Sequence, residues 1–272
     1  MSRVSGIKPQ QQTFDKSLVR QSFGSASSSY NQFTALQRTI GDQLLQQQEN
    51  LPSNQGKVLD IGAGTGYLTE KIIGSNKLDE LYALDIAPEM LRQTRLNVTA
   101  VKPLTLLCAD AEDLPLAAET VTAVYSNVAY QWCSRLALAF AEARRVLQEN
   151  GVFAFSTFGE RTLYELKDAW AEADNAVHVN SFFDADSIRQ YLIAAGFQDV
   201  SVLSEDIVMY YETPKQLMMD LKGMGAHNIN PGRNHGLTGV SAFKKMLAAY
   251  EGLRTEQGIP ATFQALYGYA RK

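Results

Sequence analysis

The stretch Val58-Leu59-Asp60-Ile61-Gly62-Ala63-Gly64-Thr65-Gly66 decides the fold of this chain. Its first residues are mostly apolar and predict a buried parallel strand, which then breaks into glycines at every second position. Glycine permits a sharp turn and lets a ligand approach the backbone, so we expect a strand that turns into a helix beside a binding site. The spacing departs from the dinucleotide pattern G-x-G-x-x-G, because the sixth position is Tyr67.

A carboxylate, Asp60, stands two residues before the first glycine. A carboxylate in that place repels a pyrophosphate but attracts an ammonium or sulfonium group. S-adenosylmethionine carries both cations and no phosphate, and the arrangement D-x-G-x-G-x-G resembles the first motif of class I methyltransferases. Two other interpretations stay open here: an ordinary tight turn and a loop that binds a nucleotide phosphate.

Composition narrows the classes of protein that this chain can belong to. With 272 residues, 45% of them hydrophobic, it can bury one substantial core. The 25 basic and 29 acidic residues give a net charge of −4, which argues against a general nucleic-acid binder. The two cysteines lie in apolar or aromatic stretches and the three histidines lack metal-ligand spacing, so we expect neither a disulfide framework nor a metal site. The polar amino terminus and the lack of a long apolar run favour a cytoplasmic protein without a membrane span.

Strands and helices alternate through the middle of the chain. We expect strands at 57–61, 81–85, 104–108, 121–126 and 151–157, and helices at 66–74, 88–100 and 134–148. Alternation at this spacing predicts a doubly wound, mostly parallel α/β sheet of seven strands. Pro88 suits the first turn of its helix, and Asn150-Gly151 suits a stop after a helix that ends at Gln148.

The two ends of the chain follow other patterns. A helical pattern begins at Tyr30, and residues 1–50 are expected to form a helical lid over the remaining domain, residues 51–272. After residue 158 we expect helices at about 163–175, 184–195 and 241–251, and strands at 197–211 and 261–270 that form an antiparallel pair at the edge of the sheet. The glycine-rich segment 222–239 predicts a loop, inside a substrate-side insertion around residues 213–255 that begins with a helix start at Thr213-Pro214.

Polar residues close several of the expected strands, where ligands of open α/β sheets bind. Asp85 lies 19 residues beyond Gly66, where a carboxylate can accept hydrogen bonds from both hydroxyls of a ribose. Ile86 and Met90 follow it and offer apolar faces to a base.

The next two strand ends complete the expected cofactor site. Asp110 or Glu112 can accept the exocyclic amine of adenine, while the N–H of Ala111 donates to a ring nitrogen, and Asn127 would lie beside the methionine part. Each acid alone could also be a solvated acid or a helix cap. Their occurrence at consecutive strand ends is what favours a site for S-adenosylmethionine.

From about Val19 to its end the chain resembles a particular methyltransferase family, the BioC group of malonyl-[acyl-carrier-protein] O-methyltransferases of biotin synthesis. The most selective stretches are N-x-A-x-Q-W-C at 127–133 and L-K-G-x-G-A at 221–226. Further similar pieces are Phe23-Gly24-Ser25-Ala26 with Tyr30, Leu36-Gln37-Arg38, residues 110–116, Phe155-Ser156-Thr157-Phe158, Thr162-Leu163-Tyr164-Glu165-Leu166 with Trp170, Pro231-Gly232-Arg233 and Tyr267 to Arg271. The chain departs from the family in its glycine loop, where relatives often carry cysteine and proline, and in its longer amino terminus.

The resemblance implies methyl transfer from S-adenosylmethionine to the free carboxylate of a malonyl thioester, held by acyl-carrier protein or coenzyme A. That carboxylate is ionised at neutral pH, so the reaction needs alignment and exclusion of water rather than a general base. With this chemistry in view we assign the catalytic site to Tyr30, Gln131, Trp132, Lys222 and Arg233, with His227 as a further candidate donor. The cofactor site is assigned to Gln37, Arg38, Asp60, Gly62, Ala63, Gly64 and Gly66 together with Asp85, Ile86, Met90, Asp110, Ala111, Glu112 and Asn127.

An acidic carrier protein would dock on a local basic patch, because the enzyme itself is mildly acidic. The candidate residues are Lys16, Arg20, Arg38, Arg233, Lys244 and Lys245, although a lysine pair on a helix is usually just solvated.

Three other functions remain open on the residues alone. They are a class I methyltransferase acting on another carboxylate, a phenol or a quinone precursor, an NAD-dependent oxidoreductase, which the glycine spacing and Asp60 oppose, and a cofactor-binding protein without catalysis.

Overall fold

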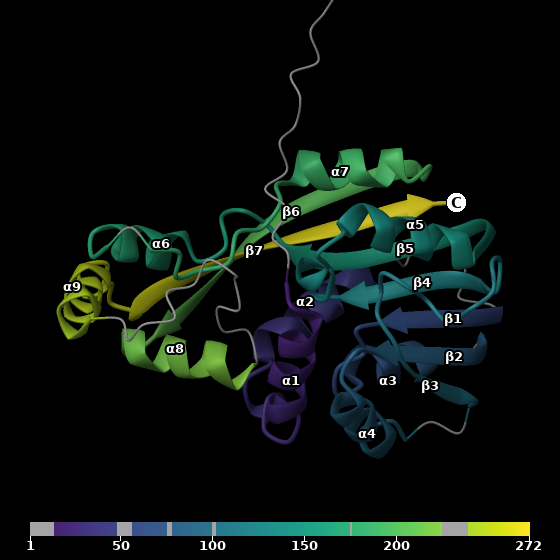
Figure 1. Cartoon of the computed structure of the whole chain (residues 1–272), viewed down its shortest axis with the longest axis horizontal. Helices are drawn as coiled ribbons and strands as arrows, with labels where there is room; N and C mark the ends of the chain where they lie inside the picture. Colours follow the sequence, from purple (N-terminus) through teal and green to yellow (C-terminus); the bar gives the residue numbers. More distant parts are fainter. Residues whose placement is uncertain (1–13, 48–55, 75–77, 100–101, 175, 225–238) are drawn as a thin grey trace, which may run out of the picture.

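The computed structural model describes residues 14–47, 56–74, 78–99, 102–174, 176–224 and 239–272. Its centre is one seven-stranded sheet with the strand order β3-β2-β1-β4-β5-β7-β6 (Figure 1). The strands are β1 (Gly56–Ile61), β2 (Leu78–Asp85), β3 (Leu104–Cys108), β4 (Val121–Asn127), β5 (Leu147–Phe158), β6 (Gln198–Tyr211) and β7 (Ile259–Arg271). Strands β1 to β5 pair in parallel, whereas β7 runs antiparallel to both β5 and β6. The prediction of a doubly wound, mostly parallel sheet with an antiparallel pair at its edge is confirmed.

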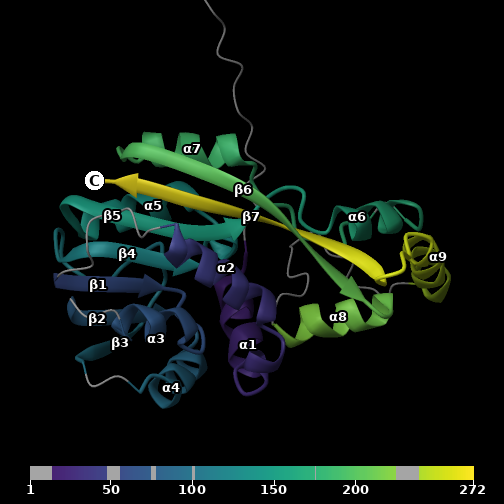
Figure 2. The same ribbon diagram turned by 180° about the vertical axis from the view of Figure 1, so that it is seen from behind.

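Helices cover both faces of the sheet (Figures 1 and 2). The helices are α1 (Lys16–Ala26), α2 (Ala35–Gln46), α3 (Tyr67–Gly74), α4 (Pro88–Asn97), α5 (Leu136–Val146), α6 (Tyr164–Ala171), α7 (Ala185–Ala194), α8 (Pro214–Gly223) and α9 (Val240–Glu251), with 3-10 turns η1 (Tyr30–Gln32) and η2 (Tyr130–Trp132). Apolar residues of α2 and α3 pack in one buried cluster, and those of α5 and α7 pack in a second cluster on the opposite face. Because helices cover both faces of the sheet, the side chains on both faces of the central strands are buried. The sequences of these strands are therefore nearly continuous apolar runs.

The carboxyl ends of β1, β2 and β4 meet at one edge of the sheet. Ile61, the last residue of β1, is opposite Leu84 of β2 and Ser126 of β4. The N-terminal helix α1 lies beside this edge (Figure 1). Residues that follow three different strands are therefore brought together under one helix.

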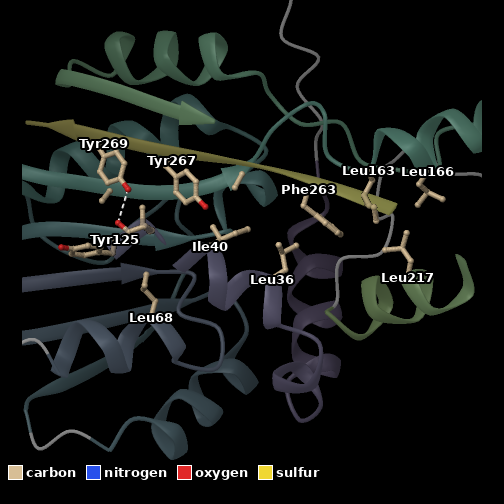
Figure 3. Close-up of a cluster of buried hydrophobic side chains, with 14 of the residues drawn as sticks. Leu36, Ile40, Leu68, Tyr125, Leu163, Leu166, Leu217, Phe263, Tyr267 and Tyr269 are labelled. Carbon is tan, nitrogen blue, oxygen red and sulfur yellow. Dashed lines mark hydrogen bonds between the residues drawn. The ribbon is translucent and has the colours of Figure 1, made fainter. Parts of the chain in front are cut away.

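Strands β6 and β7 continue well beyond the rest of the sheet as a two-stranded ribbon (Figure 2). Strand β5 ends where Phe158 pairs with Ala265, whereas β6 and β7 go on pairing as far as Tyr211 and Ile259. Helices α6, α8 and α9 gather around this far end. Figure 3 shows that the buried cluster follows the ribbon, from Tyr125 and Tyr269 at the sheet to Leu166 and Leu217 between the outer helices.

The structure corrects the expected limits of two helices. The helix expected from Tyr30 begins only at Ala35, because Tyr30 lies in a 3-10 turn and the ring of Phe33 packs on Gly223. The helix expected to run to Gln148 ends at Val146, and Asn150, with φ +62°, forms a bend inside β5 instead of a helix stop. Leu147 is completely buried and pairs with Val121, so burial of this side chain in the sheet outweighs the helix signal.

Among the helices that the structure describes, none has the length and apolar character needed to cross a membrane.

Candidate functional site

The glycine loop after β1 adopts a conformation that suits glycine far better than other residues. Gly62, Gly64 and Gly66 have φ values of +72°, +57° and +91°. The N–H groups of Gly62 and Ala63 both donate to the carbonyl of Leu84, which ties the loop to β2. A Cβ atom at position 62 would lie 2.4 Å from the Cβ of Ala129. The backbone of this loop therefore stays bare on the side where a ligand can lie.

Asp85 closes β2 directly beside the loop. Its Oδ2 accepts the N–H of Gly64 at 2.9 Å and its Oδ1 accepts the N–H of Ala87 at 2.8 Å. Burial raises the pKa of this carboxyl to about 6, although these backbone hydrogen bonds act in the opposite direction. Each carboxylate oxygen has lone pairs left over, so an ionised Asp85 can still accept two hydroxyl groups.

Asp60 lies behind the loop rather than in its open face. Its Oδ2 accepts the hydroxyl of Thr69 at 2.6 Å, while its Oδ1 is buried without a partner among the described residues. Burial, aided by the negative field of Asp85, raises the pKa of Asp60 to about 7. A buried carboxylate that lacks one partner is a suitable electrostatic complement for a bound cation.

A cavity, which we name the loop cavity, opens in front of these groups. The assigned residues that line it are Tyr30, Gly62, Gly64, Asp85, Ile86, Met90, Asp110, Ala111, Asn127 and Trp132. Bare backbone, a carboxylate with free lone pairs and apolar side chains fit a nucleoside that carries an amino-acid cation.

Helix α1 supplies cavity residues that the sequence did not indicate. Val19 and Phe23 line the cavity from above, and Lys16 reaches into it with its ammonium group 3.1 Å from Asp110 Oδ1. The sequence predicted a helical lid at residues 1–50 but not which side chains of α1 reach the cavity. The contact between residues 16 and 110 spans 94 positions and leaves no local signal.

Glu112 does not line the cavity but stabilises the segments around it. Its carboxylate pairs with Lys16 at 2.8 Å and with Arg135 at 2.8 Å, and it accepts the N–H groups of Ser134 and Arg135. Burial opposes its ionisation, but the hydrogen bonds from Lys16 and Arg135 outweigh that effect and lower the pKa of Glu112. Of the two acids expected to meet adenine, the structure brings only Asp110 to the cavity wall.

Gln37 and Arg38 lie one layer outside the loop cavity. Asn127, which lines the cavity, donates from Nδ2 to the carbonyl of Gln37 at 2.8 Å and accepts the hydroxyl of Ser156. The guanidinium of Arg38 lies over the ring of Tyr67 at 5.3 Å. Gln37 Oε1 and Arg38 Nε are both buried without a partner among the described residues. Ala63 and Gly66 likewise shape the turn without lining the cavity.

The segment after β4 is strained where it meets the cavity. Val128 has φ +51°, a conformation that β-branched residues rarely adopt, and its N–H donates to the carbonyl and the hydroxyl of Ser156. Trp132 follows, with its indole packed against Phe14 and Phe23 at ring distances of 5.6 and 5.4 Å. Strain held by hydrogen bonds at a cavity wall is typical of a functional site.

The remaining assigned residues face other spaces. Gln131 donates to the carbonyl of Val128, accepts the hydroxyl of Thr157 and lines a separate polar groove. Lys222 lines an apolar cavity on the far side of Trp132. Arg233 and His227 lie outside the described residues. Of the residues proposed for the basic patch, Lys16 is paired inside the loop cavity, Arg20 is exposed on α1, Arg38 lies over Tyr67, and Lys244 and Lys245 lie on α9. The patch stays a prediction.

Known proteins with similar sequences or folds agree with this geometry. Residues 59–155 match the family model described as "Methyltransferase domain". The chain is 36% identical to the malonyl-[acyl-carrier protein] O-methyltransferase of Halorhodospira halophila, an alignment that covers 95% of this chain and 88% of that protein. It is also 39% identical to the biotin biosynthesis bifunctional protein BioHC of Cellvibrio japonicus, over 93% of this chain and 49% of that protein.

Among solved structures, the fold is similar to phosphoethanolamine N-methyltransferase 2 of Haemonchus contortus in complex with S-adenosyl-L-methionine. The TM-score is 0.53 at 15% sequence identity, and the match covers 85% of this chain and 52% of that chain. At this identity the likeness concerns the fold alone.

Proposed function

This chain belongs to the malonyl-[acyl-carrier protein] O-methyltransferase family, and we propose that it transfers a methyl group from S-adenosylmethionine to the free carboxylate of a malonyl thioester on acyl-carrier protein. The product is the malonyl methyl ester, and we place this step in biotin biosynthesis because one relative is named biotin biosynthesis bifunctional protein BioHC. The observation that carries the proposal within the structure is Asp85, held at the glycine loop by the N–H groups of Gly64 and Ala87.

Each part of the loop cavity has a role in holding the cofactor. Asp85 would accept the ribose hydroxyls, Asp110 the adenine amine, and Ile86 with Met90 would contact the base. Asp60, with its unpaired Oδ1, would act as the electrostatic complement of the cationic end. When bound, the cofactor supplies an electrophilic methyl group on sulfonium.

The chain contributes positioning and exclusion of water to the transfer. A malonate carboxylate is already ionised at neutral pH, so the step needs no general base. Burial raises the pKa of Cys133 on the cavity wall to about 12, which keeps this thiol neutral and unreactive beside the methyl donor. The rings of Phe14, Phe23 and Trp132 would keep water from the nucleophile.

The N-terminal helix is the natural lid of such a site. Helix α1 is joined to the rest of the molecule through Phe14, whose N–H donates to Ser134 at 2.8 Å, and through Lys16 on Asp110 and Glu112. Phe23 and Tyr30 close the same side of the loop cavity. Because α1 covers one side of the loop cavity, its movement would help the cofactor to enter and leave. Residues 14–47 would therefore act as the lid that the sequence predicts for residues 1–50 over the domain of residues 51–272, while residues 1–13 and 48–50 lie outside the described residues.

A labelled methyl-transfer assay tests the function directly. Malonyl-acyl-carrier protein, malonyl-coenzyme A and a succinyl thioester are each incubated with the protein and S-adenosylmethionine labelled in its methyl group. We expect label in the malonyl thioesters, with the carrier-bound form used best, and little in the succinyl thioester. Label that appears only in phenolic or quinone acceptors would overturn the proposal.

A further inference from the structure

A second cavity, which we name the ribbon cavity, lies on the other side of Trp132 from the loop cavity. It has a volume of about 220 Å³ and lies between α6, α8 and the outer part of β7. Most of its wall is apolar: Phe158, Leu163, Leu166, Met218, Leu221 and Phe263 all line it. Figure 3 shows Leu163, Leu166 and Phe263 together at this end of the buried cluster, away from the parallel strands. An apolar cavity beside the reacting groups suits a long and mostly uncharged part of a substrate.

Trp132 connects the two cavities, because its side chain lines both of them. On the loop-cavity side the indole is fixed by the rings of Phe14 and Phe23. A ligand that fills the ribbon cavity therefore ends against the same indole as the cofactor. The acyl group of a thioester held in the ribbon cavity would arrive next to the methyl donor.

Asn180 is a polar residue of this wall whose side chain lacks one of its hydrogen-bond partners. Its side chain lines the ribbon cavity and is 7% exposed, and its Oδ1 is buried without a hydrogen-bond partner among the described residues. A buried polar atom without a partner costs free energy, which a ligand that donates a hydrogen bond would recover. By contrast, the nearby His178 is engaged, with Nε2 2.7 Å from Asp174 and its ring stacked on Trp170 at 3.5 Å.

Lys222 stands where the ribbon cavity meets a second groove, between α1 and α8. It is an exposed residue in the last turn of α8 and forms no ion pair with any other described residue. An ammonium group at the mouth of the ribbon cavity can pair with a phosphate outside the cavity, while the chain attached to that phosphate extends into the cavity.

We propose that the ribbon cavity binds the phosphopantetheine arm of the thioester substrate, with Asn180 as hydrogen-bond partner of an arm amide and Lys222 as partner of the arm's phosphate. The arm is a flexible, mostly uncharged chain with two amide N–H donors, one hydroxyl and one phosphate. Its methyl and methylene groups match the apolar wall, an amide matches the unpaired carboxamide, and the phosphate matches the cation. This inference depends on the proposed function only for the malonyl group at the end of the arm. Acyl-carrier protein and coenzyme A present the same arm, so the cavity recognises both.

Substrates that differ in the arm alone test the assignment of Asn180. Malonyl-pantetheine carries both amides, whereas the malonyl thioester of ethanethiol carries none. For Asn180→Ala we expect about a tenfold loss of kcat/KM with malonyl-pantetheine, the effect of one hydrogen bond of about 1.4 kcal/mol, and less than a twofold change with the ethanethiol ester. The control is Val179→Ala, the neighbouring residue on the same wall, which should change kcat/KM for both substrates alike. An equal loss with both substrates in Asn180→Ala would overturn the assignment.

A second comparison tests Lys222. The wild type should use malonyl-phosphopantetheine better than malonyl-pantetheine, and Lys222→Gln should remove that preference by a rise in KM at unchanged kcat. A preference that survives the substitution would overturn this part of the proposal.

Direct binding separates the inference from the proposed function. Calorimetry with phosphopantetheine itself, which carries no malonyl group, is carried out on the protein loaded with S-adenosylhomocysteine. Binding that weakens in Asn180→Ala and in Lys222→Gln supports the arm site even if no malonyl thioester is methylated, in which case only the proposed function fails. Methylation of malonyl thioesters without measurable binding of phosphopantetheine would overturn the arm site and leave the function intact.

Discussion

Asp60 and Asp85 are two buried carboxyl groups on neighbouring strands, and their burial lowers the free energy of unfolding. Burial raises the pKa of Asp60 from its ordinary value near 3.8 to about 7. Between these two pH values the unfolded state releases the proton that the folded state retains, so stability falls as the pH rises toward 7 and stays lower above it. Asp60→Asn removes this penalty. Above pH 7 we expect a gain of about 1 kcal/mol or more, which is about 2–4 °C in Tm.

The same substitution should weaken binding of the cofactor, because it removes a negative charge behind the glycine loop that attracts the cofactor's cationic end. We expect roughly tenfold weaker binding of S-adenosylmethionine by calorimetry at pH 8. Asp79→Asn is the matched control, since Asp79 is an exposed acid on β2, and it should change neither Tm nor affinity. A variant of Asp60 that loses both stability and affinity would show that the carboxylate is a structural group instead.

Asp85 predicts a pH dependence of cofactor binding. An ionised carboxylate is the better acceptor for two ribose hydroxyls, and burial raises the pKa of Asp85 to about 6. Affinity for S-adenosylhomocysteine should therefore be level above this pH and fall about tenfold for each pH unit below it. The titration is best made in the Asp60→Asn background, which removes the neighbouring carboxyl from the profile. An affinity that stays level down to pH 5 would contradict the role of Asp85.

At the scale of elements, helix α1 depends on its ion pairs for its position. Lys16 joins the helix to Asp110 and Glu112, and Glu112 keeps Arg135 as a second partner when Lys16 is removed. We expect Lys16→Met to speed the dissociation of S-adenosylhomocysteine in stopped-flow experiments by about three- to tenfold, because the lid opens more often. Arg20→Met, an exposed change on the same helix, should leave the rate unaltered. Equal rates in the wild type and Lys16→Met would argue against a lid held by this residue.

The sequence predicted the elements whose signals are local, and missed those whose position depends on distant partners. The glycine loop, Asp85 and the alternation of strands and helices are visible in short windows, so the sheet and the main wall of the loop cavity could be anticipated. Lys16 forms an ion pair with Asp110, and Phe14 packs on Trp132. Both contacts join residues more than 90 positions apart, which no periodicity reveals. Asn180 carries no motif either, and its importance appears only when the wall around it is in place.

At the scale of the whole molecule, the long β6–β7 ribbon decides where a second cavity can form. Because β6 and β7 pair past the end of β5, helices α6, α8 and α9 have a surface to pack on that is separate from the parallel strands. The sheet thus provides one cavity at its strand ends and another at its extension, and the short turn η2 lies between them. The outer part of β6, from Asp206 to Tyr211, pairs with β7 beyond the end of β5 and belongs to this extension.

The only two tryptophans of the chain lie on these two cavities. Trp132 borders both of them, whereas Trp170, stacked face to face on His178, borders the ribbon cavity but not the loop cavity. The molecule therefore contains its own pair of optical probes. Fluorescence emission from Trp132 is sensitive to a ligand in either cavity. Emission from Trp170, which lies beside a histidine that can quench it, is sensitive to a ligand in the ribbon cavity alone. The order in which two ligands arrive can thus be followed in the unlabelled protein, by its intrinsic fluorescence and in real time.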